Sequence, residues 1–177
     1  MNILYKIVFI LPVLLLGNNV RTNQILSPHL QDFDQFIGKT YKGEFLNSTP
    51  DKPLYDISKW ERALNGNAIK ITHSVNNGEY GGETFIMWDS SEKGLVSWYF
   101  TTAGFMHTAF VELTEKKYIS VEDVSNNQNG IKKVKTTIEL MPNGDLISSV
   151  KYLINQSWVA AHELIYYQDE GANVIFK

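Results

Sequence analysis

From Lys39 onward, hydrophobic and polar residues alternate with a period of two in a succession of short segments. This alternation is typical of half-buried β-strands, because successive side chains of a strand point to opposite faces of a sheet. Turn-forming residues separate the segments, as in Asn65-Gly66 and Asn143-Gly144. The pattern predicts ten strands, at residues 39–46, 54–64, 68–76, 82–89, 94–103, 106–114, 117–125, 131–141, 146–154 and 158–168.

The short connections determine how these strands are arranged. Strands joined by tight turns are antiparallel, since parallel neighbours need a crossover of about a dozen residues or more. The strands of a single domain over residues 24–177 must also hide their edges. We therefore predict an all-β fold, an antiparallel up-and-down β-barrel with about ten strands; a two-sheet sandwich is the alternative. A barrel wider than eight strands should enclose a cavity.

One segment before the strands has a helical pattern. Ser27 and Pro28 are typical of a helix start, where a hydroxyl residue caps the helix and proline takes the first position. Gly38 can end the helix. The apolar residues between them fall on one helical face: Leu30, Phe33, Phe36 and Ile37. We predict a short helix over residues 28–37 that serves as a lid or plug.

Residues 1–23 have the features of a secretory signal peptide. Lys6 precedes the mainly apolar residues 7–16, and a polar stretch follows up to Gln24. Ten apolar residues are too few to span a bilayer, which takes about 20. We expect a secreted or periplasmic protein with no transmembrane segment in its mature chain; an uncleaved N-terminal anchor is the alternative.

Composition removes several classes of function. The chain has no cysteine, which excludes disulfides, thiolate metal sites and a cysteine nucleophile. Its net charge is −3, and loss of residues 1–23, which contain Lys6 and Arg21 but no acidic residue, makes it −5. An acidic domain disfavours nucleic acid as a partner. The oligomeric state is not encoded in any pattern we find.

Three histidines lie on strands with apolar neighbours on the same face: His73, His107 and His162. One interpretation is a hydrogen-bonded histidine beside the core. The other is a histidine that faces the cavity and ligates haem, since neutral imidazole is the usual protein donor for that role. No pair of histidines has close metal-ligand spacing, so we expect no bare metal site.

The aromatic residues suggest a hydrophobic cavity wall. Trp88, Trp98 and Phe100 occupy alternating positions in the middle of the chain, and we expect them to line the cavity. Trp60 shares a strand face with Arg62, the only arginine after residue 23. That arginine could bind the polar end of a ligand through its planar guanidinium, or pair with an acid outside the barrel.

Several stretches resemble a known family. Residues 36–44, with Tyr41 where tryptophan is usual, are similar to the G-x-W-x-G-x-G opening of calycin-type barrels. Residues 64–66, 78–82, 88–89 and 99–105 resemble a bacterial lipocalin-like family grouped as DUF1579-like, which lies near the nitrobindin-type haem barrels. The resemblance implies a ten-stranded barrel with a small-ligand cavity. It also implies that His162, on the last predicted strand, is the residue that could match the nitrobindin haem ligand.

These observations leave four functions open. The leading one is a binding protein for one small hydrophobic or amphipathic molecule, with no catalytic residues and no required cofactor. The second is a haem barrel with His162 as axial ligand. The third is an isomerase or cyclase whose acid and base would come from Glu83, Glu163 and His107. The fourth is a structural envelope protein with a filled barrel.

Overall fold

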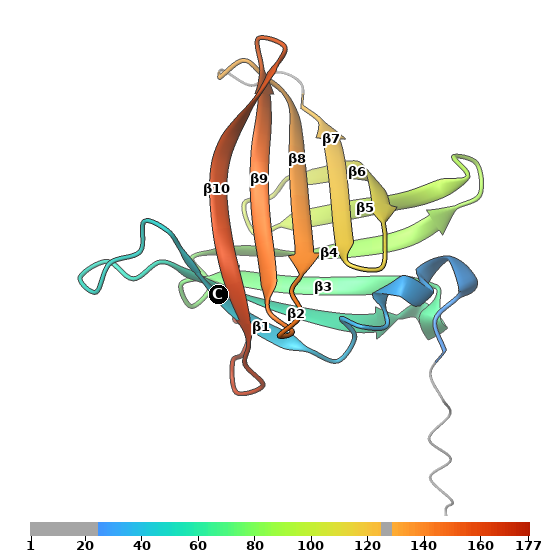
Figure 1. Cartoon of the computed structure of the whole chain (residues 1–177), viewed down its shortest axis with the longest axis horizontal. Coiled ribbons are helices and arrows are strands. Elements are labelled where there is room, and N and C mark those ends of the chain that lie inside the picture. The colour runs from blue at the N-terminus through green and yellow to red at the C-terminus, as the bar shows by residue number, and fades with distance from the viewer. Residues whose placement is uncertain (1–24, 125–128) are drawn as a thin grey trace, which may run out of the picture.

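The computed structural model describes residues 25–124 and 129–177, so the predicted signal peptide lies outside the described residues. The described chain forms a closed antiparallel barrel of ten strands (Figure 1), as the alternation predicts. The strands are β1 Thr40–Phe45, β2 Tyr55–Ala63, β3 Ala68–Val75, β4 Tyr80–Asp89, β5 Gly94–Thr101, β6 Met106–Leu113, β7 Lys117–Asp123, β8 Ile131–Leu140, β9 Leu146–Ile154 and β10 Ser157–Gln168.

Each strand pairs with its neighbours in the chain, and β1 closes the ring by pairing with β10. This up-and-down order follows from tight turns between strands. In the β9–β10 hairpin, Asn155 and Gln156 alone connect the pair Ile154 and Ser157. Both turn residues have positive φ, 48° and 64°. Two such residues in succession give a hairpin turn whose twist matches that of the flanking strands.

The ring is closed along only part of β10. β1 pairs with residues Leu164 to Gln168 of β10, so among the described residues the half from Ser157 to Glu163 pairs with β9 alone. That half is exposed on both faces and stands free on the left of Figure 1. A β-bulge between Ala160 and His162 interrupts its pairing with β9. The side wall of the barrel is therefore open next to this half-strand.

The opposite end of the barrel is filled by the segment before β1. This segment forms a 3₁₀ helix, η1, at Pro28–Phe33, with Pro28 in the first turn. It is shorter than the predicted helix over residues 28–37, and Ser27 makes no side-chain cap. The reason lies in the spacing. Leu30 and Phe33 are three residues apart, which places them on one side of a 3₁₀ helix. Phe36 follows three residues later in the turn after η1, and all three side chains are fully buried.

Aromatic packing fixes this plug against the barrel wall. The Phe36 ring stacks on Trp60 with centroids 4.9 Å apart, and Tyr118 meets Trp60 edge-on at 6.3 Å. Outside the core, His29 of η1 stacks on Trp88 at 3.8 Å. The other buried apolar residues that pack in this core are Leu26, Leu30, Phe33, Tyr41, Ile69, Ile86, Val111, Leu146, Leu164 and Tyr166. The segment is therefore part of the core.

Two polar atoms in the core lack hydrogen-bond partners among the described residues, the Tyr41 hydroxyl and the Trp60 indole nitrogen. Both side chains are at most 1% exposed. Burial, with a smaller effect from Asp145, raises the pKa of Tyr41 to about 12. The plugged end thus buries aromatic surface without satisfying all of its polar atoms.

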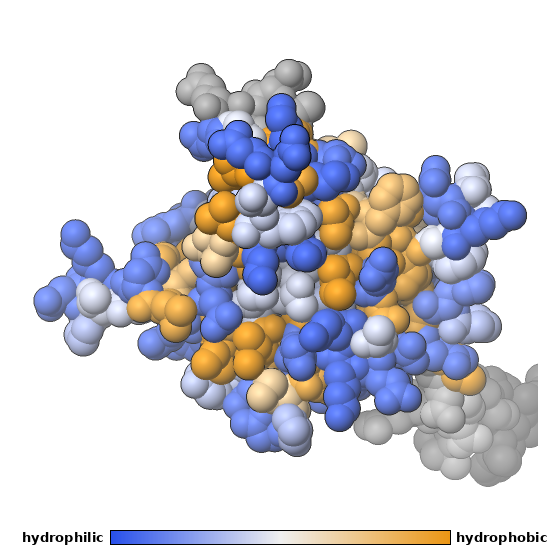
Figure 2. Space-filling model, turned by 45° about the horizontal axis from the view of Figure 1, so that its top comes forward, coloured by the Kyte–Doolittle hydropathy of each residue, from blue (hydrophilic) through white to orange (hydrophobic). Residues whose placement is uncertain are grey.

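The outer surface carries hydrophobic areas between hydrophilic ones (Figure 2). Phe100, Met106 and Phe110 are 47%, 57% and 59% exposed, on β5 and β6. The C-terminal residues run along the outside of β3, where the Ile175 amide donates a hydrogen bond to the Ser74 hydroxyl at 3.0 Å. No helix among the described residues has the length and hydrophobicity needed to cross a membrane.

Candidate functional site

A cavity of about 490 Å³ lies inside the barrel. Its volume falls within the range of small-molecule sites, so the described barrel is not filled. Fourteen of the lining residues are apolar or tyrosine: Phe45, Ile71, Val75, Tyr80, Tyr99, Phe105, Ala109, Tyr118, Val134, Ile138, Val150, Tyr152, Leu164 and Tyr166. The other twelve are polar: Asp56, Ser58, His73, Thr84, Ser97, His107, Thr108, Ser120, Glu122, Thr136, Ser148 and His162.

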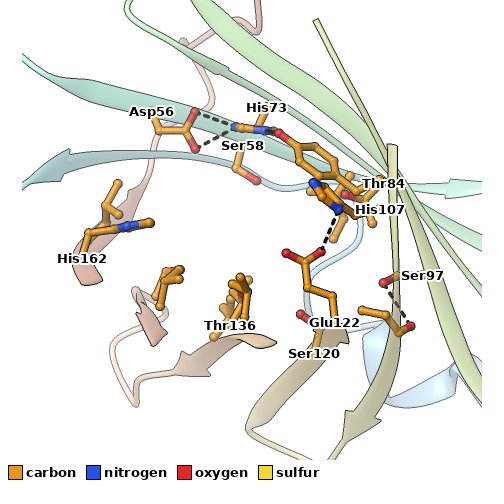
Figure 3. Close-up of a pocket in the computed structure, with 18 of the residues that line it drawn as sticks. Asp56, Ser58, His73, Thr84, Ser97, His107, Ser120, Glu122, Thr136 and His162 are labelled. Atoms are coloured by element: carbon orange, nitrogen blue, oxygen red, sulfur yellow. Dashed lines mark hydrogen bonds and ion pairs between the residues drawn. The ribbon is translucent and has the colours of Figure 1, made fainter. Parts of the chain in front are cut away.

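A chain of hydrogen bonds crosses one wall of the cavity (Figure 3). His73 Nδ1 lies 3.1 Å from Asp56 Oδ1, and because a carboxylate only accepts, this nitrogen donates. His73 Nε2 lies 2.7 Å from the Tyr99 hydroxyl, which is 3.1 Å from the Tyr80 hydroxyl. Tyr166 donates to Asp56 Oδ2 at 2.7 Å. The chain therefore joins strands β2, β3, β4, β5 and β10.

The glycine at the centre of this chain explains its geometry. Gly82 of β4 stands between His73 of β3 and the end of β5. Having no side chain, it lets the His73 imidazole reach Tyr99 across the intervening strand. A Cβ atom at Gly82 would come within 2.6 Å of the Tyr99 ring and would collide with the Phe100 carbonyl oxygen.

Burial keeps the tyrosines of this chain protonated. It raises the pKa of Tyr99, and the hydrogen bond with Tyr80 raises it further. Burial also raises the pKa of Tyr166 well above its ordinary value, and the neighbouring Asp56 acts in the same direction. Both phenols are therefore hydrogen-bond donors at neutral pH.

A second polar group lies on β6 and β7. Glu122 points into the open centre of the cavity (Figure 3), and its Oε2 lies 3.7 Å from His107 Nδ1. The Glu122 side chain is 19% exposed and that of His107 is 33% exposed. Burial raises the pKa of Glu122, and the nearby His107 partly opposes this shift. A mostly buried carboxylate therefore faces the cavity, with one long contact to an imidazole and no hydrogen-bond donor among the described residues.

His162 lines the cavity from the half-open strand β10. Within the described residues its imidazole has no hydrogen-bond or ion-pair partner, and the Phe45 ring lies 5.8 Å away. Partial burial lowers its pKa, so the neutral form dominates at neutral pH. Its ring nitrogens are available to a ligand.

The structure brings together three of the eight sequence-predicted site residues, His73, His107 and His162. The expected cavity lining by Trp88, Trp98 and Phe100 is wrong. Trp98 and Phe100 point outward, because Ser97 and Tyr99 of the same strand face the cavity. Trp88 belongs to the plugged end, where it stacks on His29.

The remaining two predicted residues also lie at the plugged end. Trp60 is buried in the core there. Arg62 Nε donates to the Ile25 carbonyl oxygen at 3.5 Å and does not line the cavity. The acid–base candidate Glu83 pairs with Lys70 at 2.7 Å, and neither it nor Glu163 lines the cavity. Of the three catalytic candidates, the cavity contains His107 alone.

Sequence reasoning missed the carboxylates Asp56 and Glu122, the tyrosines and the small hydroxyl residues of the lining. One available signal was period-two placement, since Glu122 shares its face with Ser120 and Tyr118. Among residues 25–124 and 129–177, no group of three or more histidine, aspartate or glutamate side chains is arranged to hold a metal ion.

Comparison with known proteins supports the fold. No protein-family model matches the chain, and no curated protein matches it. Fifteen chains of solved structures match. One is the crystal structure of Rv2717c from M. tuberculosis, with a TM-score of 0.54, 10% sequence identity, and coverage of 82% of this chain and 100% of that chain. At this identity the likeness shows a shared barrel fold, and the DUF1579-like and nitrobindin-type assignments stay predictions.

Proposed function

We propose that this protein binds one small amphipathic molecule inside its barrel. The observation that carries the proposal is the 490 Å³ cavity, whose wall combines apolar side chains with convergent polar groups. Such a wall suits a ligand that is mostly apolar and has one or two polar atoms. The plug closes one end and the gap beside β10 offers an entrance, so a ligand would be held from one side.

The polar groups favour specific recognition over simple partitioning. Tyr99 and Tyr80 are held by the hydrogen-bond chain from Asp56, so their positions are set before a ligand arrives. Preorganised groups lose little entropy on binding. The hydroxyls of Ser120 and Thr136, which face each other across β7 and β8, supply further donors and acceptors.

A matched pair of variants tests this proposal. Thr136 lines the cavity and its neighbour Thr137 does not. In the full chain, Thr136→Phe should fill the cavity and weaken binding of the neutral fluorescent probe Nile red at least tenfold, whereas Thr137→Phe should leave it unchanged. Fluorescence titration should give one saturable site. Absence of saturable binding, or equal effects of the two variants, would contradict the proposal.

Export is part of the same proposal and rests on residues 1–23. N-terminal sequencing and native mass spectrometry of the protein exported by its own signal should show a chain that starts near residue 24 and carries a bound small molecule. An intact N-terminus on the exported protein would support the anchored alternative.

Haem is a second candidate, favoured by the unpartnered neutral imidazole of His162. His162 would supply an axial nitrogen, and bound haem would supply gas or redox chemistry at its iron. The cavity lining holds no lysine or arginine for the propionates, which would have to face solvent beside β10. Added haemin should give a Soret band that His162→Ala abolishes; a band unchanged in this variant would remove the assignment.

A further inference from the structure

We infer that the cavity selects an organic cation: its ligand has a protonated amine that binds Glu122. This inference rests on the proposed ligand-binding function and specifies the ligand's charge. It is carried by three observations on the cavity wall: the position of Glu122, the engagement of the other carboxylate, and the signs of the lining charges.

Glu122 is placed as a binding group. Its side chain is mostly buried and points into the cavity centre (Figure 3). Among the described residues no donor lies within hydrogen-bond distance of its carboxylate, and the nearest partner, His107 Nδ1, is 3.7 Å away. A buried carboxylate without hydrogen bonds is costly. A ligand ammonium would supply the missing donors and would add a positive charge to the long contact with His107.

Asp56 does not compete for that role. It accepts hydrogen bonds from Tyr166 at 2.7 Å and from His73 at 3.1 Å, so both carboxylate oxygens already have donors. Its side chain is only 7% exposed. The two carboxylates therefore differ in use: Asp56 holds the wall together, and Glu122 faces the space that a ligand would fill.

The charges of the lining reject an anion. It contains two carboxylates and three histidines but no lysine or arginine. His162 is held mainly in its neutral form. A carboxylate or sulfonate ligand would lose its water without gaining a cationic partner, which is unfavourable. A neutral ligand would leave Glu122 with only its 3.7 Å contact to His107, whereas a protonated amine would donate hydrogen bonds to it and add a positive charge.

Three probes of nearly equal size and different charge test the inference: 4-phenylbutylamine, 4-phenylbutan-1-ol and 4-phenylbutyrate. Binding to the full chain is measured by calorimetry at pH 7.5. A charged hydrogen bond in a partly buried site corresponds to a factor of about 10–100 in affinity. We expect the amine to bind tighter than the alcohol by that factor, and the acid to bind weakest.

Variants of Glu122 test whether this residue causes the preference for the amine. Glu122→Gln should lower amine affinity to that of the alcohol and leave alcohol binding unchanged, and Glu122→Asp should keep part of the preference. Glu112→Gln is the matched control, because Glu112 lies on the neighbouring strand, is exposed and does not line the cavity. It removes the same charge and should change no affinity. Thermal unfolding of each variant confirms that the barrel is retained.

The outcomes separate this inference from the function on which it rests. Alcohol binding as tight as amine binding, tighter binding of the acid, or an amine preference that survives in Glu122→Gln would overturn the cation assignment and leave the binding function standing. Failure of all three probes and of Nile red to bind would overturn both.

Discussion

The two ends of the barrel use the same strands for opposite purposes. At the plugged end, inward positions carry large side chains such as Trp60 and Ile86, and Leu30, Phe33 and Phe36 fill the space that remains. Towards the other end, inward positions of the same or adjacent strands carry Ser58, His73 and Ser97, and a cavity results. The number of strands is the same at both ends. The size and polarity of the inward side chains therefore decide where the interior of the barrel is a packed core and where it is a ligand cavity.

The difference also appears in how polar atoms are treated. The plugged end leaves the Tyr41 hydroxyl and the Trp60 indole nitrogen without partners among the described residues. The cavity end builds a chain of four side chains from Asp56 to Tyr80 and adds Tyr166 to it. Packing carries the stability of the first region, and hydrogen bonding sets the geometry of the second.

The largest expected effect on stability comes from a substitution in the plugged end of the barrel. Phe36→Ala removes a fully buried ring stacked on Trp60 and should lower the free energy of unfolding by about 3–5 kcal/mol. Phe100→Ala is the control, because the Phe100 side chain is 47% exposed. Its cost should be well under half as large. Urea denaturation measures both, and equal costs would show that the segment before β1 does not contribute to the core.

The next effect comes from the cavity wall. Gly82→Ala should lower the free energy of unfolding by about 1–3 kcal/mol, since its Cβ meets the Tyr99 ring and the backbone of β5. It should also displace Tyr99 from His73 and weaken Nile red binding. Gly104→Ala is unsuitable as a control because its φ is positive, so Gly94→Ala, whose Cβ has only one neighbour, at 3.8 Å, serves instead.

A third prediction compares hydroxyls at the two ends. Tyr166→Phe removes a donor to Asp56 and should cost about 1.5–3 kcal/mol of unfolding free energy. Tyr41→Phe removes a hydroxyl that has no partner among the described residues, so stability should stay level or rise. Denaturation of the two variants under one set of conditions is the measurement. A loss in Tyr41→Phe as large as in Tyr166→Phe would contradict this prediction.

The smallest effect is a pH dependence. The folded-state pKa of Glu122 is raised by burial, so below that pKa the folded chain holds a proton that the unfolded chain loses at about 4.5. This carboxyl therefore lowers stability as pH rises through that window, and the penalty is complete above it. Glu122→Gln should be more stable than wild type at neutral pH, and the gap should narrow towards pH 4.5. His107→Gln separates the opposing contribution of the neighbouring imidazole.

The sequence was sufficient for the barrel because its signals are local. Period-two alternation and turn residues such as Asn155 report on their own neighbourhood, and a chain of tight turns leaves few topologies. The predicted helix was too long because a local pattern does not specify the packing that decides where the helix ends. The three-residue spacing of Leu30, Phe33 and Phe36 also fits part of an α-helical face. It does not show that the helix ends at Phe33 and that Phe36 stacks on Trp60 from the turn beyond it.

The site was harder to predict because it depends on which face of each strand points inward. We assigned Trp98 and Phe100 to the cavity on account of their size, yet exposed aromatic side chains are common on protein surfaces. The bulge before His162 shows a second limit. It places Trp158 outside, beside Lys135, although simple alternation puts it on the same face as His162. Neither register nor bulge is visible in a single strand's sequence.

The unpaired half of β10 has a consequence for how the protein behaves at high concentration. From Ser157 to Glu163 its outer edge presents amide and carbonyl groups in the spacing that another strand would match, and Trp158 and Val159 there are 40% and 49% exposed. Self-association should therefore begin at this edge. Crowded or partly denatured samples are expected to form intermolecular sheets from this half-strand.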